Sequence, residues 1–288
     1  MCSSDLIVNW FNRHRSKAVA WSQLGYSVGG MMVPLVVLAL EAWGWRATAF
    51  LSGVAVLILG LPMAQVVRHR PGPFSELPDG EVISESEGPK QVVARDLSAR
   101  QAMATSAFWL ISFGHASALL TVSAMMVHLV AHLSEGLGYS LAAAAVMVTV
   151  VTGSQMVGQL LGGYLGDRFD KRYLSVACMA AHAGALVGMA YASETWQVVF
   201  YAVTHGLAWG IRGPLMVALR ADYFGAAAFG TIMGFSSLIV MLGMSLGPII
   251  AGLMADASGN YESGFTVLAA AAFLGGFCFL FAKPPQRP

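Results

Sequence analysis

The sequence has 288 residues, of which 57% are hydrophobic and only 11% are charged, and its formal net charge is +1. Soluble domains carry about 25% charged residues, so this chain has too few charges to cover a water-exposed surface. The near-neutral charge also argues against a surface that binds nucleic acid. Cys2, Cys178 and Cys278 are isolated, with no CxxC or metal-binding spacing, and we expect neither a disulfide nor a metal site.

The chain starts with MCSSDLIVNWFNRHR, in which an acidic residue and a short apolar patch precede a basic cluster. This order is the reverse of a signal peptide, where a basic region precedes an apolar one. The pattern instead indicates the end of one helix running into a cytoplasmic loop. It predicts that the chain begins inside a longer protein.

Apolar windows of about 20 residues, long enough to cross the hydrocarbon core of a bilayer, recur along the chain. All of them lack charged residues except the sixth, which contains Arg212. A fully apolar segment can also be a buried helix of a soluble protein, but so many in one chain favour a membrane protein. The sequence predicts eight spans, at residues 18–40, 47–67, 107–132, 139–163, 173–193, 196–218, 228–254 and 263–282.

The basic residues divide between alternate connections of these spans. One set of connections holds Arg13, Arg15, Lys17, Arg68, Arg70, Lys90, Arg95, Arg100, Arg168, Lys171, Arg172, Arg220, Lys283 and Arg287. The other set holds only Arg46 and is otherwise acidic or neutral. Because basic loops stay on the cytoplasmic side, both termini are expected in the cytoplasm. The sequence therefore predicts an integral, multi-pass protein of the inner or plasma membrane.

Residues 68–106 differ from the rest of the chain. RHRPGPFSELPDGEVISESEGPKQ is polar, rich in Pro and Gly, and acidic in its middle, which is typical of a flexible linker. A short interfacial helix is expected within residues 96–105. The predicted organisation is two spans in residues 1–67, a cytoplasmic linker at 68–106, a six-span bundle at 107–283 and a tail at 284–288.

Two stretches of the chain, residues 10–34 and 223–248, resemble each other. Each has an aromatic pair in a cytoplasmic loop followed by a glycine-rich span, and Gly29 and Pro34 match Gly243 and Pro248 at the same separation. Repeated halves are common in secondary transporters, which suggests that class.

The loop after the fourth predicted span reads GGYLGDRFDKRY. Asp167 and Arg168 lie at its helix end, and Lys171 and Arg172 follow. A carboxylate beside a helix terminus and a basic cluster could lock two helices in one state of a transport cycle. A solvated loop that sets membrane orientation is the alternative. The pattern Gly163-x3-Asp167-Arg168-x2-Lys171-Arg172 resembles the cytoplasmic loop motif of the major facilitator superfamily.

The resemblance extends over essentially the whole chain. Asp170 stands where the loop motif normally has Gly, and Gly243-x3-Gly247-Pro248 resembles an antiporter-type motif that is usual in the first half of the superfamily. RADYFGAAAFGTIMG, WFNRHR with GYSVGG, and RHRP with LPDG are similar to the oxalate/formate antiporter and monocarboxylate transporter branch.

The resemblance implies an all-α membrane fold of twelve spans in two bundles around a central cavity. This chain matches spans five to twelve. It would therefore be an N-terminally truncated copy, with a complete C-terminal six-helix bundle and two helices of the N-terminal bundle, and the missing helices are expected in the full-length protein.

Arg212 is the main candidate for substrate binding. A charged residue within a span costs about 2.5–3.5 kcal/mol on insertion scales, so it calls for an explanation. The neighbouring Pro214 should kink the helix and free carbonyl groups. One explanation is a site for a substrate carboxylate, which the guanidinium fork suits. The other is a side chain that reaches the interface or bonds the freed carbonyls.

Two histidines and a glutamine complete the expected substrate site. His205 lies two helical turns before Arg212, and His115 lies on the third span, which in the superfamily faces the cavity. Either histidine could couple proton movement, although hydrogen-bonded core histidines are commoner. Monocarboxylate-type transporters often carry an Arg in the span that matches 139–163. Here that span has only Gln155 and Gln159.

The sequence lacks a P-loop and an HExxH motif, and it offers no catalytic context for a GxSxG motif, so we expect neither an enzyme nor a cofactor. It predicts a secondary active transporter of a small solute, with an organic anion such as a monocarboxylate fitting best, working by alternating access with a coupled proton or counter-substrate. A membrane scaffold or sensor, and a permease subunit of an ATP-driven transporter, remain alternatives.

Overall fold

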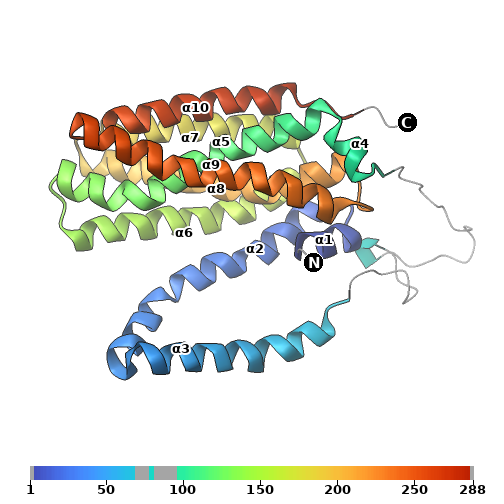
Figure 1. Cartoon of the computed structure of the whole chain (residues 1–288), viewed down its shortest axis with the longest axis horizontal. Coiled ribbons are helices and arrows are strands. Elements are labelled where there is room, and N and C mark those ends of the chain that lie inside the picture. Colours follow the sequence, from blue (N-terminus) through green and yellow to red (C-terminus); the bar gives the residue numbers. More distant parts are fainter. Residues whose placement is uncertain (1–2, 69–77, 81–95, 286–288) are drawn as a thin grey trace, which may run out of the picture.

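The computed structural model describes residues 3–68, 78–80 and 96–285, and every regular element in this part of the chain is a helix. The remainder of the predicted linker, 69–77 and 81–95, lies outside the described residues. The helices are α1 (Ser3–Trp10), α2 (Arg15–Met31), α3 (Val33–Val66), α4 (Ala99–Met103), α5 (Ser106–Ala131), α6 (Leu141–Gly166), α7 (Lys171–Ala190), α8 (Thr195–Phe224), α9 (Phe229–Ser258) and α10 (Glu262–Phe281). The short turns η2 (Pro78–Gly80) and η3 (His132–Gly136) complete the set (Figure 1).

Six helical segments of the described chain are long and apolar enough to cross a bilayer. They are Leu38–Val66, Ser106–Gly136, Leu141–Gly166, Lys171–Ala190, Phe229–Ser258 and Glu262–Phe281. Two expected spans are less apolar. Span 196–218 lies in α8, whose 30 residues include Arg212, Arg220 and Asp222. Span 18–40 falls on α2, which has 17 residues, and on the start of α3. The count of eight spans therefore stays a prediction.

Helix α3 is interrupted within the connection that the sequence places between residues 40 and 47. Gly44 has φ 75° and ψ 165°, a backbone conformation that favours glycine. Figure 1 shows α3 lying apart from the bundle formed by α5–α10. Its apolar side chains are largely uncovered, as in Ile58, which is 64% exposed.

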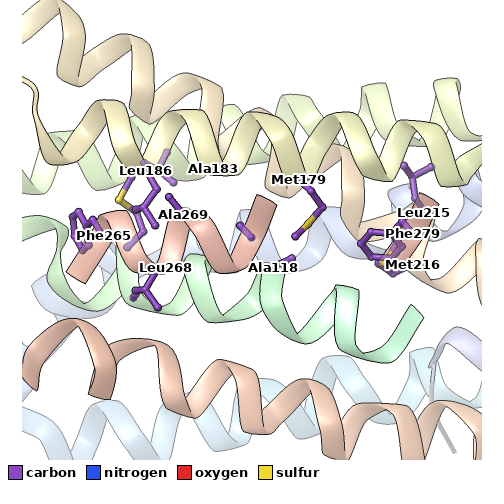
Figure 2. Packing of buried hydrophobic residues seen from close by; sticks show 14 of the residues in the cluster. Ala118, Met179, Ala183, Leu186, Leu215, Met216, Phe265, Leu268, Ala269 and Phe279 are labelled. Carbon is purple, nitrogen blue, oxygen red and sulfur yellow. The ribbon is translucent and has the colours of Figure 1, made fainter. Parts of the chain in front are cut away.

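The helices α5–α10 pack together in close pairs. Helix α6 packs against α8, α5 against α9 and α7 against α10, while α2 lies on α6 and α8. Figure 2 shows Leu186 of α7 beside Phe265 and Ala269 of α10, and these side chains belong to one buried cluster. The short helix expected within 96–105 is confirmed as α4, which begins at a capping box formed by Ser98 and Gln101.

Glycines bring α6 and α8 into backbone contact. A Cβ added at Gly162 would lie 2.7 Å from the Cα of Ile211, and one at Gly210 would lie 2.7 Å from the backbone nitrogen of Gln159. Small residues allow this approach, and close packing matters because lipid provides no hydrophobic drive between helices.

The helix-packing residues expected from the repeat lie in different surroundings. Gly243 of α9 packs on the backbone of Ala116, and a Cβ at Gly247 would lie 2.6 Å from Ser123 Oγ of α5. No heavy atom of the described chain lies within 4 Å of a Cβ built on Gly29. Pro34 lies in α3, and its side chain is outside what the structure describes.

Gly162→Ala should destabilise the bundle, because the new methyl group collides with the α8 backbone at Ile211. Overpacking of this kind costs about 1–3 kcal/mol. The measurement is the thermal unfolding midpoint of the purified protein in detergent.

Gly153→Ala on the same helix is the matched control, because no heavy atom of the residues that the structure describes lies within 4 Å of its added Cβ. We expect that variant to be neutral or slightly stabilised, since replacing a helical glycine by alanine gains about 0.4–1 kcal/mol. Equal midpoints for the two variants would contradict the packing argument.

Candidate functional site

Helix α8 buries two arginines, Arg212 and Arg220, and each is 1% exposed. Arg220 was expected in the connection after a span ending at residue 218, and this is wrong. Helix α8 continues to Phe224 and ends at Gly225, whose φ of 82° stops it. Counting basic residues by loop misassigns Arg220 because its burial depends on side chains of other helices.

Arg220 is held by a chain of hydrogen bonds. Its Nη1 donates to the carbonyl oxygen of Met216 at 2.8 Å, while Nε and Nη2 donate to Ser236 Oγ at 3.1 and 2.8 Å. Because a guanidinium only donates, Ser236 Oγ accepts from Arg220, and its own hydroxyl group donates a hydrogen bond to Ser112 Oγ at 2.8 Å. Ser112 donates in turn to the carbonyl oxygen of Phe108 at 2.7 Å. The chain ties α8 to α9 and α5.

His115 of α5 also contacts Arg220. Nη2 of Arg220 donates to Nδ1 of His115 at 3.3 Å, so Nδ1 carries no proton and the ring proton lies on Nε2. The positive charges of Arg212 and Arg220 both act on this ring. A second proton on His115 would remove the hydrogen bond and place a third positive charge in the cluster.

Arg212 is less well satisfied than Arg220. Its Nε and Nη1 atoms are buried without a hydrogen-bond partner among the described residues. Its charge acts on Cys178 and His182 of α7 and on His205 of its own helix. His182 and His205 meet through their Nδ1 atoms at 3.3 Å, and the Nε2 atoms of both rings are unpartnered. The His182 contact was missed because it depends on how α7 is turned against α8.

The described residues offer no carboxylate to either buried arginine. The ion pairs they form link Asp222 to Arg15 at 2.6 Å and to Lys171 at 2.8 Å, at the helix ends. An unpaired buried charge is costly, and a bound anion would offset that cost. Arg212 and Arg220 are therefore the buried positions of the described chain where negative charge would be most favourable.

Gln155 is not joined to this cluster. It is half-buried on α6, and its backbone carbonyl oxygen lies against Gly210 of α8. No hydrogen bond within the described part of the chain links its side chain to the arginines. Gln159, in contrast, accepts a buried hydrogen bond from Ser27 of α2 at 3.0 Å. Its contact is structural, between α2 and α6.

Asp167, in the loop between α6 and α7, is bound to the N-terminus of α2. Its carboxylate oxygens accept the backbone N–H groups of Ser16 at 2.9 Å and Lys17 at 3.3 Å. These amides have no acceptor within α2, and the helix dipole also favours a carboxylate there. Gly163 permits this approach, because a Cβ there would lie 2.7 Å from that of Ala20.

The other residues of the loop motif make local contacts. Arg168 stacks on the Tyr164 ring at 4.0 Å, and Lys171 pairs with Asp222. Asp170 accepts the backbone N–H of Arg172 at 2.8 Å and so caps α7. We call this side of the bundle, with Lys17, Arg168, Lys171 and Arg172, the basic end; it lies at the right of Figure 1.

Ser236→Ala should destabilise the protein, because Arg220 loses the acceptor for its Nε and Nη2 atoms while it stays buried. Leaving such donors unsatisfied costs about 1–3 kcal/mol. The measurement is again the thermal unfolding midpoint in detergent.

Thr204→Ala is the control for this change, because the hydroxyl of Thr204 bonds, within the described part of the chain, only the Phe200 carbonyl oxygen of its own helix. Its midpoint should stay close to that of the unmodified protein. A Ser236→Ala midpoint as high as that of the control would show that the hydrogen-bond chain does not hold Arg220.

Known proteins resemble the chain over nearly all of its length. A sequence profile of the Major Facilitator Superfamily matches residues 2–129 and 111–288. MFS transporter asaE of Aspergillus flavus is 26% identical over 280 residues, which cover 94% of this chain and 58% of that protein. Membrane sensor protein UhpC of Escherichia coli is 24% identical over 302 residues, which cover 98% of this chain and 68% of that protein. Monocarboxylate transporter 13 of Rattus norvegicus is 32% identical over 162 residues, which cover 55% of this chain and 37% of that protein.

A solved structure shares the fold. The human organic anion transporter MFSD10 superimposes with a TM-score of 0.71 at 15% sequence identity, covering 96% of this chain and 66% of that one. The chain matches 58% of the length of asaE, the fungal relative. These matches and the apolar helices identify an integral, multi-pass membrane protein from a family of transporters rather than enzymes. The chain belongs to the Major Facilitator Superfamily.

Proposed function

We propose that the protein moves a small organic anion, such as a monocarboxylate, across the membrane by secondary active transport with alternating access. The observation that carries the proposal is the burial of two guanidinium groups on α8 without a carboxylate partner among the described residues. Monocarboxylate transporter 13, one of the relatives, is named for such a substrate. The likeness to oxalate/formate antiporters stays a prediction.

The cluster offers a carboxylate several donors at once. Nε and Nη1 of Arg212 have no partner among the described residues, and Nη2 of Arg220, besides its hydrogen bond to Ser236 at 2.8 Å, makes only a long one to His115, at 3.3 Å. Hydrogen bonds between a guanidinium and a carboxylate are shorter and stronger than those between neutral groups. A substrate carboxylate would therefore replace the His115 nitrogen as an acceptor from Arg220. His205 would support Arg212 electrostatically, and Gln155 would lie outside the contacts.

We propose a proton as the coupled ion, with His115 as its carrier. Protonation of Nδ1 would break the hydrogen bond from Arg220 and add a charge near two arginines. An anion bound between these groups would make that protonation more favourable. Because linkage is reciprocal, the proton would strengthen anion binding by the same factor.

The contact of Asp167 with α2 is proposed as the lock of one transport state. It joins the α6–α7 loop to α2 through two backbone amides that have no acceptor within α2, so it can form and break without unfolding either helix. The basic end would face the cytoplasm, together with both termini, in keeping with its charge.

Uptake of radiolabelled L-lactate into proteoliposomes tests the proposal. We expect uptake without ATP, driven by an inward proton gradient, and no uptake of D-glucose. Arg212→Gln and Arg220→Gln should each lower uptake about tenfold or more, which is the scale of one charge-assisted hydrogen bond. Arg46→Gln is the control, since Arg46 is exposed and stacks on Trp45. Unchanged uptake in both substituted proteins would contradict the anion site.

His115→Gln tests the coupling. This variant should keep an acceptor for Arg220 but should not take up a proton, so its lactate uptake should no longer respond to the proton gradient. The measurement compares initial rates at equal internal pH and external pH of about 6 and 8, on either side of the ordinary histidine pKa. A response equal to that of the unmodified protein would rule out His115 as the carrier.

A sensor is the second candidate function, because UhpC, which matches 98% of this chain, is named as one. A sensor would bind its ligand without moving it. Lactate that raises the thermal midpoint of the protein but is not taken up would favour the sensor. ATP-dependent uptake, in contrast, would favour a permease subunit.

We also propose that four further spans precede Met1 in the complete transporter, as the family resemblance implies. The coding DNA upstream of Met1 tests this directly. Four additional in-frame spans would support it, and a stop codon immediately upstream would count against it.

A further inference from the structure

The segment between α3 and α4 places a carboxylate on the turn between α1 and α2. Asp79 Oδ2 accepts the backbone N–H groups of Asn12 at 3.0 Å and Arg13 at 2.8 Å, and Oδ1 accepts that of His14 at 3.3 Å. These amides precede the first turn of α2 and make no helical hydrogen bond. The side chain of Asp79 thus satisfies three consecutive donors of one turn.

The same segment places a second carboxylate on the turn between α8 and α9. Asp96 Oδ2 accepts the backbone N–H groups of Ala226 at 3.1 Å and Ala227 at 2.7 Å. Gly225, with φ +82°, comes directly before them, and a Cβ there would collide with the Asp96 carboxylate. The turn is therefore shaped to receive Asp96.

The two carboxylates bind equivalent positions of the internal repeat. Gly243 lies 214 residues after its counterpart Gly29, and the same separation of 214 relates Asn12 to Ala226 and Arg13 to Ala227. Asp79 and Asp96 therefore hold the same backbone amides in the two copies. This agreement comes from two independent sets of hydrogen bonds, since the repeat was found from other residues.

Each end of the segment is also tied to its turn by a second contact. Trp10 Nε1 donates to the carbonyl oxygen of Arg68 at 2.7 Å, at the end of α1. The backbone N–H of Leu97 donates to the carbonyl oxygen of Phe224 at 3.0 Å, and the Leu97 side chain is buried. The described parts of the segment are thus attached on either side, one to each repeat copy.

A different carboxylate binds the next amides of α2. Asp167 holds Ser16 and Lys17, and it comes from the α6–α7 loop rather than from the segment after α3. Two carboxylates therefore bind backbone amides around the start of α2, on either side of Arg15. Asp79 belongs to the chain continuous with α3, whereas Asp167 belongs to the bundle of α5–α10.

Asp79 is ionised at neutral pH. Partial burial raises its pKa, but the hydrogen bonds from the backbone of Arg13, Asn12 and His14 outweigh this and hold the pKa below its ordinary value of 3.8. The folded-state pKa is thus lower than that of the unfolded chain. The contribution of Asp79 to the turn is present above pH 3.8 and is lost as pH falls below it.

We propose that Asp79 and Asp96 are positioning residues that stay in place and preset the N-termini of α2 and α9, so that a carboxylate such as Asp167 can bind and leave the adjacent amides. The assignment reaches beyond solute transport, because it concerns the shape of two turns and not the nature of the solute. The proposal predicts an asymmetry. Loss of Asp79 should disturb the amides that bind Asp167, whereas loss of Asp167 should leave the amides that bind Asp79 unchanged.

Residue-resolved hydrogen–deuterium exchange of the full chain in detergent micelles tests this asymmetry. In Asp79→Ala, amides 12–14 should exchange about tenfold faster, and so should amides 16 and 17, although Asp167 is intact. In Asp167→Ala, only amides 16 and 17 should accelerate. Unchanged protection of 16 and 17 in Asp79→Ala, or acceleration of 12–14 in Asp167→Ala, would overturn the proposal.

The second copy and the controls complete the experiment. Asp96→Ala should accelerate amides 226 and 227, because it removes their acceptor. Asp79→Asn and Asp96→Asn keep an oxygen acceptor and should show smaller effects; effects as large as those of the alanine variants would contradict positioning by these hydrogen bonds. Asp170→Ala removes a cap of α7 alone and should leave residues 12–17 unchanged.

The exchange pattern requires no transported substrate. Loss of lactate uptake with the asymmetry intact would overturn the proposed function and leave the positioning role standing. Loss of the asymmetry with lactate uptake intact would overturn the positioning role and leave the proposed function standing. If an alanine variant does not fold, the asparagine variant supplies the same comparison at the same amides.

Discussion

Helix α8 has to keep two guanidinium groups away from lipid, and the arrangement of its neighbours follows from that requirement. A charged group facing the hydrocarbon is costly, so Arg212 and Arg220 lie inside the bundle, 1% exposed. Arg220 is satisfied by hydroxyl and carbonyl oxygens that tie three helices together. Arg212 is left with free donors among histidines and a cysteine. The same charges that constrain packing are the basis of the anion site that we propose.

The glycine contact between α6 and α8 makes this burial possible. Because Gly162 and Gly210 let the two backbones touch, one face of α8 is closed against α6 and the arginines lie on another. Bulky residues at these positions would push α8 away from α6. Packing and electrostatics therefore depend on one another: the close approach fixes the rotation of α8, and its rotation decides which groups surround the guanidinium groups.

The sequence predicted features that depend on local patterns. Apolar windows located the helices of the bundle, a short helix was expected within residues 96–105 where α4 lies, and Arg212 stood out as a charge within a span. It failed where the outcome depends on the rotation of one helix against another. Arg220 was counted as a loop residue, since a charge near a span end is buried only if α5 and α9 provide oxygens there. The His182–His205 pair and the two partners of the turns, Asp79 and Asp96, are long-range contacts with no local signal.

The ion pairs of Asp222 give α8 a second role. Asp222 lies two residues after Arg220, about 3 Å farther along the helix axis. It pairs with Arg15 at the start of α2 and with Lys171 at the start of α7. Because a helix moves as a rigid rod, a displacement of Arg220 along this axis also displaces Asp222 and strains both of its ion pairs. Helix α8 is thus a mechanical link, and its ion pairs, partly open to water, weaken with ionic strength while the buried arginines remain shielded.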